Sequence, residues 1–190
     1  MEIKGAEASV TIETDKVIKR RERKSYRHPE LDERIINERT STEAKNVKRA
    51  RKYGVNAPEV LDVENDEIVF EKIDGVIWKE VEEVEKMEKV GENVALMHEN
   101  QVIHGDLTTS NLMIDKSGEA FLIDFGLSFI SERVEDQAVD IHLLKQVLDS
   151  SHPGKSEEAW EKFLEGYREN SRYDEVLERF EEVQSRGRYK

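Results

Sequence analysis

Two short polar segments carry the residue types that phosphoryl transfer requires. Residues 104–111 read HGDLTTSN and residues 124–126 read DFG. A carboxylate can orient an attacking hydroxyl and accept its proton, while an amide oxygen and a second carboxylate can hold magnesium against nucleotide phosphates. Asp106 is therefore the candidate catalytic base, and Asn111 and Asp124 are the candidate magnesium ligands. Either segment alone is a weak signal, but their order and spacing together predict a site that binds ATP and Mg²⁺.

A nucleotide also needs a cation against its phosphates and a partner that positions this cation. Lys19 ends the apolar run V-I-K, and Glu43 lies in the helix-forming stretch that follows. A Lys–Glu bridge of this kind occurs in kinase-type sites, so we expect a catalytic Lys19 paired with Glu43. The alternative is an ordinary surface ion pair, worth less than about 1 kcal/mol.

Two further segments are assigned to the nucleotide by their positions in the chain. The stretch before Lys19 occupies the place of a glycine-rich flap, although only one glycine of the usual pattern is present. Its phosphate contacts would come from backbone N–H groups. A linker after the second pair of strands would offer backbone groups to the adenine edge. The predicted contacts are Gly5, Ala6, Glu7, Ala8 and Val10 in the flap, and Phe70, Glu71 and Ile73 in the linker.

Two other polar residues are expected to order the 104–111 loop. His104 can hydrogen-bond neighbouring backbone, which suits it better to ordering the loop than to exchanging protons. Asp140, in the run A-V-D-I-H, could reach under the loop and accept its backbone N–H groups, or it could lie on a helix surface. The sequence leaves these two alternatives open.

These motifs lie in a chain of 190 residues without cysteine, which excludes disulfide bonds and thiol catalysis. The length suits one domain with a core. No apolar run is long enough to span a membrane and the first residues lack a signal-peptide profile, so we expect a cytoplasmic protein with no membrane partner. The net charge is −13, yet residues 16–27 hold seven basic side chains and one acidic, so a basic face is still expected.

The surrounding sequence predicts strands, a helix, further strands and then helices. Residues 3–20 contain two strands around a turn, and residues 60–73 contain two more. Residues 31–52 are rich in helix formers, and the pattern T-S-T-E at 40–43 leaves open whether they form one helix or two. The remaining helices are expected at about 79–97, where apolar side chains recur at helical spacing, at 134–148 and at 157–184.

This order of elements fits an α+β enzyme with a minimal two-lobed protein-kinase-like fold. We expect an N-lobe at residues 1–73, with the sheet, one helix and the nucleotide flap, and a helical C-lobe at 74–184, with the catalytic loop. A mobile basic tail is predicted at 185–190, because it offers no apolar content to bury. Its cations, Arg186, Arg188 and Lys190, could contact a nucleic-acid phosphate backbone or simply keep the terminus soluble.

At the level of whole motifs, the chain resembles the small atypical kinases of the PRPK type, the kinase subunits of the KEOPS (EKC) tRNA-modification complex. The shared features cover essentially the whole chain, and two of them are far more specific than general kinase motifs. These features are G-A-E-A at 5–8, Y-R-H-P-x-L-D at 26–32, R-T-x-x-E-A at 39–44, the loop at 104–111, D-F-G at 124–126 and the basic C-terminus.

The resemblance implies a kinase-like fold with a reduced C-lobe that binds ATP and magnesium and can phosphorylate itself and acidic proteins. It also implies an ATPase that supports threonylcarbamoyl transfer to the adenosine beside the tRNA anticodon. The implied partners are the threonylcarbamoyl transferase subunit, bound near the active site and C-lobe, a small subunit docked on the N-lobe, and tRNA contacted by the basic tail.

Two absences in the sequence agree with this interpretation. No A-P-E motif and no long activation segment follow Gly126, and Gly105 replaces the arginine of H-R-D that would pair with an activation-loop phosphate. Control by a bound partner is then expected. The alternatives are a small-molecule kinase of the aminoglycoside or choline type, which lacks room here for a substrate lobe, and a RIO-type kinase, whose nucleotide-loop pattern is not found. A third is a nucleotide-stabilised scaffold, which would not need the full set of polar residues.

Overall fold

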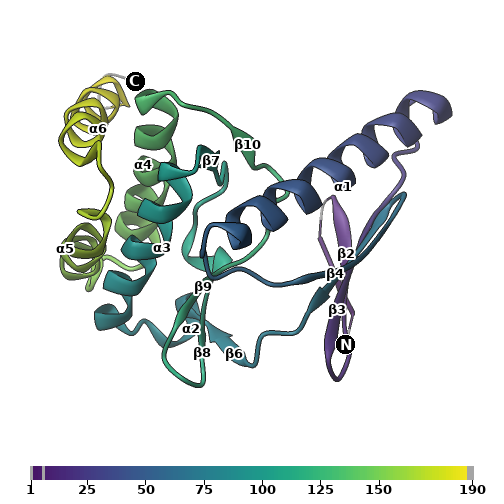
Figure 1. Ribbon diagram of the computed structural model, residues 1–190, viewed down its shortest axis with the longest axis horizontal. Helices are drawn as coiled ribbons and strands as arrows, with labels where there is room; N and C mark the ends of the chain where they lie inside the picture. Colours follow the sequence, from purple (N-terminus) through teal and green to yellow (C-terminus); the bar gives the residue numbers. More distant parts are fainter. Residues whose placement is uncertain (1, 6, 188–190) are drawn as a thin grey trace.

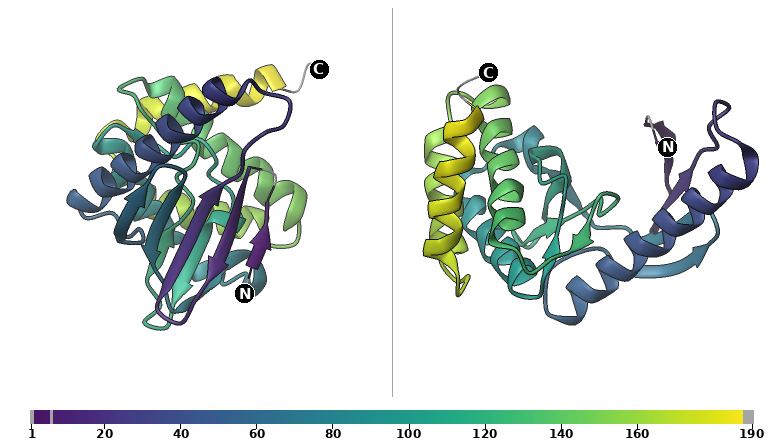
Figure 2. Two further views of the ribbon diagram at one scale, coloured as in Figure 1. Left: turned by 90° about the vertical axis from the view of Figure 1, so that its right-hand side faces the viewer. Right: turned by 90° about the horizontal axis from the view of Figure 1, so that it is seen from above.

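A five-stranded antiparallel sheet forms the first part of the molecule. The computed structural model describes residues 2–5 and 7–187, with the backbone alone for 186 and 187. The strand order is β1-β2-β3-β5-β4, so two separate hairpin regions meet where β3 pairs with β5. The left view of Figure 2 shows these strands side by side. They are β1 (Glu2–Lys4), β2 (Ala8–Ile12), β3 (Lys16–Arg21), β4 (Val60–Glu64) and β5 (Glu67–Glu71).

Both predicted pairs of strands are confirmed. The turn between β2 and β3 is closed by a hydrogen bond from the N–H of Glu13 to the carbonyl of Lys16, at 2.9 Å. In the turn between β4 and β5, Asn65 has a φ of 26°, a conformation that asparagine tolerates better than most residues. The edge strand β1 adds to the two strands expected at 3–20.

One continuous helix, α1 (Pro29–Lys52), runs above the sheet in Figure 1 and extends toward the helical half of the molecule. A proline at its start and acidic residues in its first turn favour this beginning, and three basic residues in its last turn favour its end. The T-S-T-E pattern does not start a second helix, because Thr40 lies buried inside α1. Packing of the buried face, which includes Ile36, Ala44, Val47 and Ala50, outweighs the local capping signal.

The prediction of one helix at 79–97 is wrong for the first half of this range. Glu82 stops the helical path with a left-handed φ of 50°, and the fully buried Trp78 donates its indole N–H to the carbonyl of Glu83 at 2.9 Å. Tertiary packing of one tryptophan thus overrides a run of good helix formers. The segment consists of β6 (Gly75–Ile77), α2 (Trp78–Val81), the 3-10 turn η1 (Val84–Lys86) and α3 (Met87–Glu99).

The two motifs are carried by short strands and one 3-10 turn. The segment between them is a strand–turn–strand, and it pairs with β6 in a three-stranded sheet of order β6-β8-β9. A second small sheet pairs the strand before the first motif with the strand after the second. These elements are β7 (Val102–Ile103), η2 (Thr109–Asn111), β8 (Leu112–Asp115), β9 (Ala120–Leu122) and β10 (Phe129–Ile130).

Three helices complete the fold, where the sequence predicted two helical regions. The region expected at 157–184 is two helices, separated at residues 168–172. Helices α3 and α5 approach closely, since a Cβ at Gly91 or Gly166 would overlap backbone atoms of the facing helix. No helix within residues 2–5 and 7–187 is long and apolar enough to cross a membrane. The three helices are α4 (Val134–Ser151), α5 (Ser156–Tyr167) and α6 (Tyr173–Gly187).

The tail predicted at 185–190 is wrong in its first three residues, because α6 continues through Gly187. Only the backbone of Arg186 is described, and Arg188 and Lys190 lie outside the described residues.

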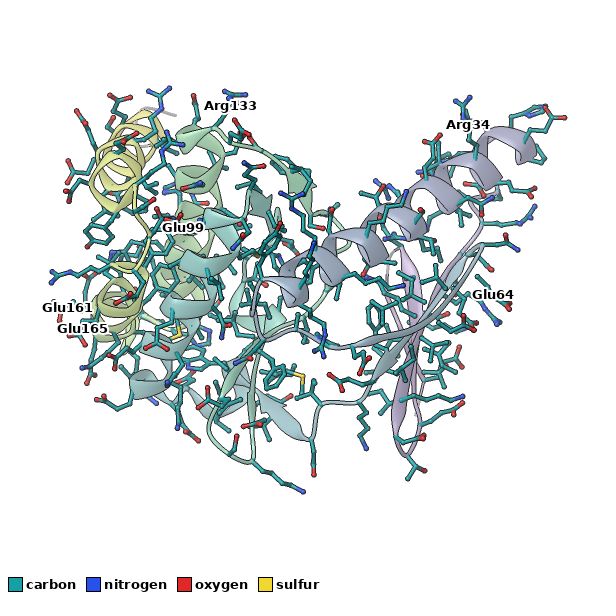
Figure 3. All side chains as sticks on the ribbon, viewed as in Figure 1. Arg34, Glu64, Glu99, Arg133, Glu161 and Glu165 are labelled. Atoms are coloured by element: carbon teal, nitrogen blue, oxygen red, sulfur yellow. The ribbon has the colours of Figure 1, made fainter. Side chains whose placement is uncertain are left out.

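In Figure 1 the sheet and most of α1 lie on one side, and helices α3 to α6 lie on the other. Charged side chains cover both ends, with Arg34 and Glu64 at the first and Glu161 and Glu165 at the second (Figure 3). The boundary predicted between residues 73 and 74 falls between β5 and β6, and it stays a prediction.

Candidate active site

Helix α4 holds the 104–111 loop through a buried carboxylate. Asp140 is only 2% exposed, and its two oxygens accept the backbone N–H groups of His104 at 2.8 Å and Gly105 at 2.9 Å. Backbone donors out of contact with water need such partners. Of the two alternatives for Asp140, the contact under the loop is confirmed and the surface position is wrong.

A buried histidine supports Asp140 in turn. Nε2 of His98 lies 3.1 Å from Oδ2 of Asp140, and its Nδ1 lies 2.8 Å from the hydroxyl of Tyr167. Burial opposes ionisation of Asp140, but the hydrogen bond and charge of His98 outweigh it and lower the pKa of this carboxyl below its usual value. Burial of Tyr167, together with the nearby charge of Asp140, raises the pKa of this hydroxyl well above its usual range. His98 is a supporting residue that was not predicted from the sequence, although its place on the apolar stripe of α3 was a usable signal.

Gly105 turns the loop so that Asp106 and Asn111 meet. Its φ is +76°, and a Cβ there would overlap the carbonyl of Leu127, which favours glycine over the arginine of H-R-D. Nδ2 of Asn111 donates to the carbonyl of Asp106 at 2.8 Å and to its Oδ2 at 2.9 Å. Nδ1 of His104 accepts the N–H of Asp106 at 3.3 Å, so the histidine contacts the loop backbone as predicted.

Asp124, the second predicted magnesium ligand, lies in a turn with unusual backbone geometry. Its φ is 61°, in the left-handed region that residues other than glycine rarely adopt. Oδ1 accepts a hydrogen bond from Nζ of Lys19 at 2.7 Å and one from the N–H of Gly126 at 3.2 Å. Burial opposes ionisation, but the charge and hydrogen bond of Lys19 outweigh it and lower the pKa of Asp124. The carboxylate is therefore ionised at neutral pH, as a metal ligand must be.

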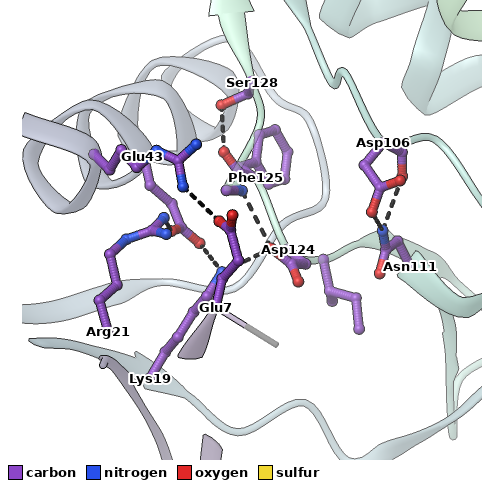
Figure 4. Close-up of polar contacts among 12 residues, drawn as sticks. Glu7, Lys19, Arg21, Glu43, Asp106, Asn111, Asp124, Phe125 and Ser128 are labelled. Atoms are coloured by element: carbon purple, nitrogen blue, oxygen red, sulfur yellow. Dashed lines mark hydrogen bonds and ion pairs between the residues drawn. The ribbon is translucent and has the colours of Figure 1, made fainter. Parts of the chain in front are cut away.

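Lys19 joins the sheet, helix α1 and the DFG turn. Its Nζ lies 2.6 Å from Oε1 of Glu43 and 2.7 Å from Oδ1 of Asp124 (Figure 4). The structure thus contains the predicted Lys19–Glu43 pair. Since the exposed fractions of these two side chains are 11% and 1%, the alternative of an ordinary surface ion pair is wrong.

Arg21 is a site residue that was predicted only as part of a basic run. Side chains alternate along β3, so Arg21 lies on the same face as Lys19. Its Nη2 contacts Oε2 of Glu43 at 2.5 Å, and Glu43 therefore binds one cation through each oxygen. The side chain is 6% exposed, and its Nε has no hydrogen-bond partner among the described residues. The alternation from Lys19 was the signal that would have found it.

The predicted flap is a short turn between β1 and β2. The N–H of Gly5 donates to the carbonyl of Ala8 at 2.9 Å, and Val10 pairs with Lys19 in the register of β2 and β3. Strand pairing therefore sets the flap directly beside the lysine. Ala6 lies outside the described residues.

Glu7 ties this flap to helix α1. Its carboxylate pairs with the guanidinium of Arg39 (Figure 4). The pair is partly exposed, so its contribution to stability is small. It nevertheless links the flap to the helix that carries Glu43.

The predicted linker contacts need one revision. Phe70 is buried in β5, and the N–H of Glu71 already donates to the carbonyl of Glu59 at 2.9 Å. The Glu71 carboxylate also accepts the side chain of Arg51 at 3.3 Å. The expected adenine contacts are therefore reduced to the carbonyl of Glu71 and the backbone of Ile73.

The two candidate metal ligands are adjacent through their backbones. The N–H of Ile123 donates to the carbonyl of Asn111 at 2.9 Å, which sets Asn111 beside Asp124. Nδ2 of Asn111 is bound to Asp106, which leaves its Oδ1, and Asp124 is bound through Oδ1, which leaves its Oδ2. One amide and one carboxylate oxygen suit Mg²⁺ when phosphate oxygens and water complete the shell. Within the described part of the chain, no three His, Cys, Asp or Glu residues gather as a metal site of their own.

Comparison with known proteins agrees with this geometry. The sequence matches the RIO domain over residues 6–143. Setting aside a RIO-type kinase because of its flap pattern was therefore wrong, since the match includes most of the flap and both motifs.

Individual relatives cover nearly the whole chain. A protein from Methanospirillum hungatei, named a probable bifunctional tRNA threonylcarbamoyladenosine biosynthesis protein, is 45% identical over 98% of this chain and 36% of its own length. The KEOPS complex subunit Bud32 of Pyrococcus abyssi is 40% identical over 92% of this chain and 84% of its own. The probable serine/threonine-protein kinase BUD32 homolog of Archaeoglobus fulgidus is 41% identical over 97% and 94%. The chain thus spans 36% of the bifunctional relative and most of the other two.

Solved structures share the fold at low sequence identity. A complex of Rio2 kinase with ADP, Mg²⁺ and phosphoaspartate from Chaetomium thermophilum has a TM-score of 0.61 at 17% identity, over 100% of this chain and 71% of that one. WaaP in complex with acyl carrier protein has a TM-score of 0.63 at 14% identity, over 93% and 81%. These likenesses concern the fold alone, and they confirm the expected kinase-like α+β architecture.

Proposed function

Because the chain belongs to the Bud32 family of RIO-domain proteins, we propose that it is a Mg-ATP-dependent atypical serine/threonine protein kinase and ATPase. The observation that carries this proposal is the position of Lys19, whose Nζ contacts Glu43 at 2.6 Å and Asp124 at 2.7 Å. One ammonium group between a helix and the DFG turn is the arrangement that positions nucleotide phosphates in kinase-type sites.

Each polar residue then has a role set by its position. Asp106 orients the attacking hydroxyl or water and accepts its proton, and its hydrogen bond from Asn111 fixes the carboxylate for that task. Lys19 binds phosphate oxygens, while Glu43 and Arg21 hold α1 against the sheet. Asn111 and Asp124 would hold magnesium, which neutralises charge on the phosphates when bound.

We also propose that the protein acts within the KEOPS complex of the cytoplasm and supports threonylcarbamoylation of the tRNA adenosine next to the anticodon. The names of the Pyrococcus abyssi and Methanospirillum hungatei relatives support this assignment. The proposed partners are the threonylcarbamoyl transferase subunit, a small subunit on the N-lobe, and tRNA contacted by Arg186, Arg188 and Lys190.

An apolar surface beside the site supports the first of these partners. Directly after the DFG turn, Leu127, Phe129 and Ile130 are 52%, 42% and 46% exposed. Neighbouring exposed apolar side chains of this size are typical of protein interfaces. In the bifunctional relative the matched region is 36% of one polypeptide, so the transferase part of such a chain is the occupant that we assign to this surface.

The test is ATP hydrolysis by the purified chain, measured with and without the transferase subunit and tRNA. We expect turnover that both partners increase, and a loss of about 100-fold or more in Asp106→Ala, because a positioned base contributes on that scale. Asp62→Ala is the matched control, since Asp62 is exposed on β4 and its carboxylate accepts the next backbone N–H.

Three other outcomes would overturn this assignment. Unchanged hydrolysis in Asp106→Ala would remove the role of that residue. Mg-ATP binding that raises the melting temperature without any turnover would indicate a nucleotide-stabilised scaffold. Turnover stimulated by an aminoglycoside or choline, and not by the transferase subunit, would indicate a small-molecule kinase.

A further inference from the structure

A chain of three hydrogen-bonded residues, of which Thr109 and His152 are buried and Glu82 is partly exposed, reaches the turn that carries Asn111. Oγ1 of Thr109 lies 3.0 Å from Nε2 of His152, and Nδ1 of His152 lies 2.7 Å from Oε1 of Glu82. The three come from separate elements, because Thr109 starts η2, Glu82 follows α2 and His152 follows α4. We call this set the Thr109–His152–Glu82 relay.

The direction of the hydrogen bond between His152 and Glu82 follows from the acid. A hydrogen bond from His152 lowers the pKa of Glu82 against the opposing effect of burial, and a bond from Lys155 lowers it further. An ionised carboxylate only accepts hydrogen bonds, so Nδ1 of His152 carries the proton and donates. Its Nε2 then faces the hydroxyl of Thr109 at 3.0 Å. The ring is held by Glu82 and aimed at the catalytic loop.

The order hydroxyl, imidazole and carboxylate is also that of a Ser-His-Asp triad. A nucleophile must be reached by its substrate, but Thr109 is 1% and His152 5% exposed. The indole of Trp78 packs edge-on against the imidazole, with ring centroids 5.2 Å apart. The hydroxyl therefore cannot attack a substrate, and the relay acts through the loop.

Thr109, the loop residue that the relay holds, lies two positions before Asn111, a proposed magnesium ligand. η2 contains only Thr109 to Asn111, and a 3-10 turn this short has few restraints of its own. Asn111 completes it by donating its N–H to the carbonyl of Thr108 at 2.9 Å. Anchoring the side chain of Thr109 at one end of this turn therefore fixes where the amide of Asn111 lies at the other.

We propose that His152 and Glu82 are positioning residues that act through Thr109 to hold the amide oxygen of Asn111 for magnesium. This inference rests on the proposed function, since it assigns Mg²⁺ to Asn111 and Asp124. It also gives a physical reason for the first residue of the T-S-N sequence at 109–111.

Supporting residues around a metal site change metal affinity by about 10- to 100-fold when they are lost. We therefore expect Thr109→Val and His152→Phe to weaken Mg²⁺-dependent nucleotide binding by about 10-fold, while binding without Mg²⁺ is unchanged. Thr109→Ser keeps the hydroxyl and should retain near wild-type affinity.

The matched control is Lys145→Met. Lys145 is buried on α4 before the same connection to α5, where it contacts Asp149 at 2.6 Å and Glu157 of α5 at 2.7 Å. Its ion pairs do not involve the catalytic loop. We expect Lys145→Met to lower the melting temperature without changing the Mg²⁺ dependence.

The experiment has two arms. Calorimetric titration with a non-hydrolysable ATP analogue, with and without Mg²⁺, measures the metal-dependent affinity. Amide hydrogen exchange of residues 106–111 in the nucleotide-free protein measures the loop itself. Weaker Mg²⁺-dependent binding and faster exchange in Thr109→Val and His152→Phe, with neither in Lys145→Met, would support the proposal.

Wild-type Mg²⁺ dependence in Thr109→Val, or equal changes in His152→Phe and Lys145→Met, would overturn it. If the wild-type chain binds no nucleotide, the proposed function fails. The exchange arm then still decides whether the relay orders the loop, and unchanged exchange in all variants would refute it.

Discussion

Asp140 accepts the backbone N–H of Gly105 at 2.9 Å, although 35 positions separate the two in the sequence. Its other oxygen accepts the N–H of His104 and also lies 3.1 Å from Nε2 of His98. The loop that carries Asp106 is therefore fixed by helix α4 and, through His98, by α3. The geometry of the site depends on how the C-terminal helices pack.

Removing this carboxylate should destabilise the whole fold. We expect Asp140→Ala to lower the free energy of unfolding by about 2–4 kcal/mol, because two backbone donors and a buried imidazole lose their partner. Asp136→Ala on the same helix is the control, since its carboxylate is partly exposed and its loss should cost about 1 kcal/mol or less. Urea unfolding followed by tryptophan fluorescence measures both values, and equal losses would contradict the assigned role.

The stability of the protein at acidic pH should depend on the carboxylates of Asp124 and Asp140. The pKa values of Asp124 and Asp140 are lowered in the folded protein, while in the unfolded chain they return to about 3.9. Between the folded and unfolded values the unfolded state binds more protons, so this stability is complete above about pH 4 and is lost as the pH falls through the folded values. The free energy of unfolding should drop more steeply below about pH 4 in the wild type than in Asp140→Asn. Parallel pH profiles for the two proteins would refute this.

The sequence predicted the polar centre of the site because its residues lie close together in the chain or in fixed motif order. Asp106, Asn111 and Asp124 follow one another within two short segments, and Lys19 ends a strand that was itself predictable. The two alternatives for Asp140, a contact under the loop or a position on the helix surface, could not be distinguished from the sequence, because its partners lie 35 and 36 positions away. Long-range contacts of this kind depend on the fold and leave no local pattern.

Local helix propensity was misleading where one packing contact determined the backbone conformation. The run from Lys79 to Lys86 consists of good helix formers with helically spaced valines, yet it is broken at Glu82 by the burial of Trp78. The opposite occurs in α1, where a capping pattern at Thr40 is absorbed into one helix because its apolar face is continuous. In both segments tertiary burial outweighs tenths of a kcal/mol per residue of intrinsic preference.

The second cation on Glu43 should matter for nucleotide binding. We expect Arg21→Met to raise the KM for ATP by several-fold and to lower the free energy of unfolding by about 1–3 kcal/mol, since one oxygen of a buried carboxylate loses its partner. Arg20→Met is the control one position earlier on β3, where the exposed side chain pairs with Glu67 and its loss should cost under about 1 kcal/mol. Steady-state ATPase kinetics and urea unfolding measure the two effects. The same small change in both variants would show that Arg21 does not position Glu43.

The basic C-terminus should contribute to tRNA binding through charge. Because α6 continues through Gly187, deletion of residues 185–190 would also remove helical structure, so neutralising Arg186, Arg188 and Lys190 to glutamine is the cleaner change. Three fewer phosphate contacts should weaken tRNA association most at low salt and reduce the slope of log K against log salt by roughly two to three. Glutamine at Arg34, Lys45 and Lys48, exposed cations on α1, removes the same net charge elsewhere. Equal weakening by both triple variants would assign the effect to overall charge, and unchanged binding without the C-terminal cations would show that they do not contact tRNA.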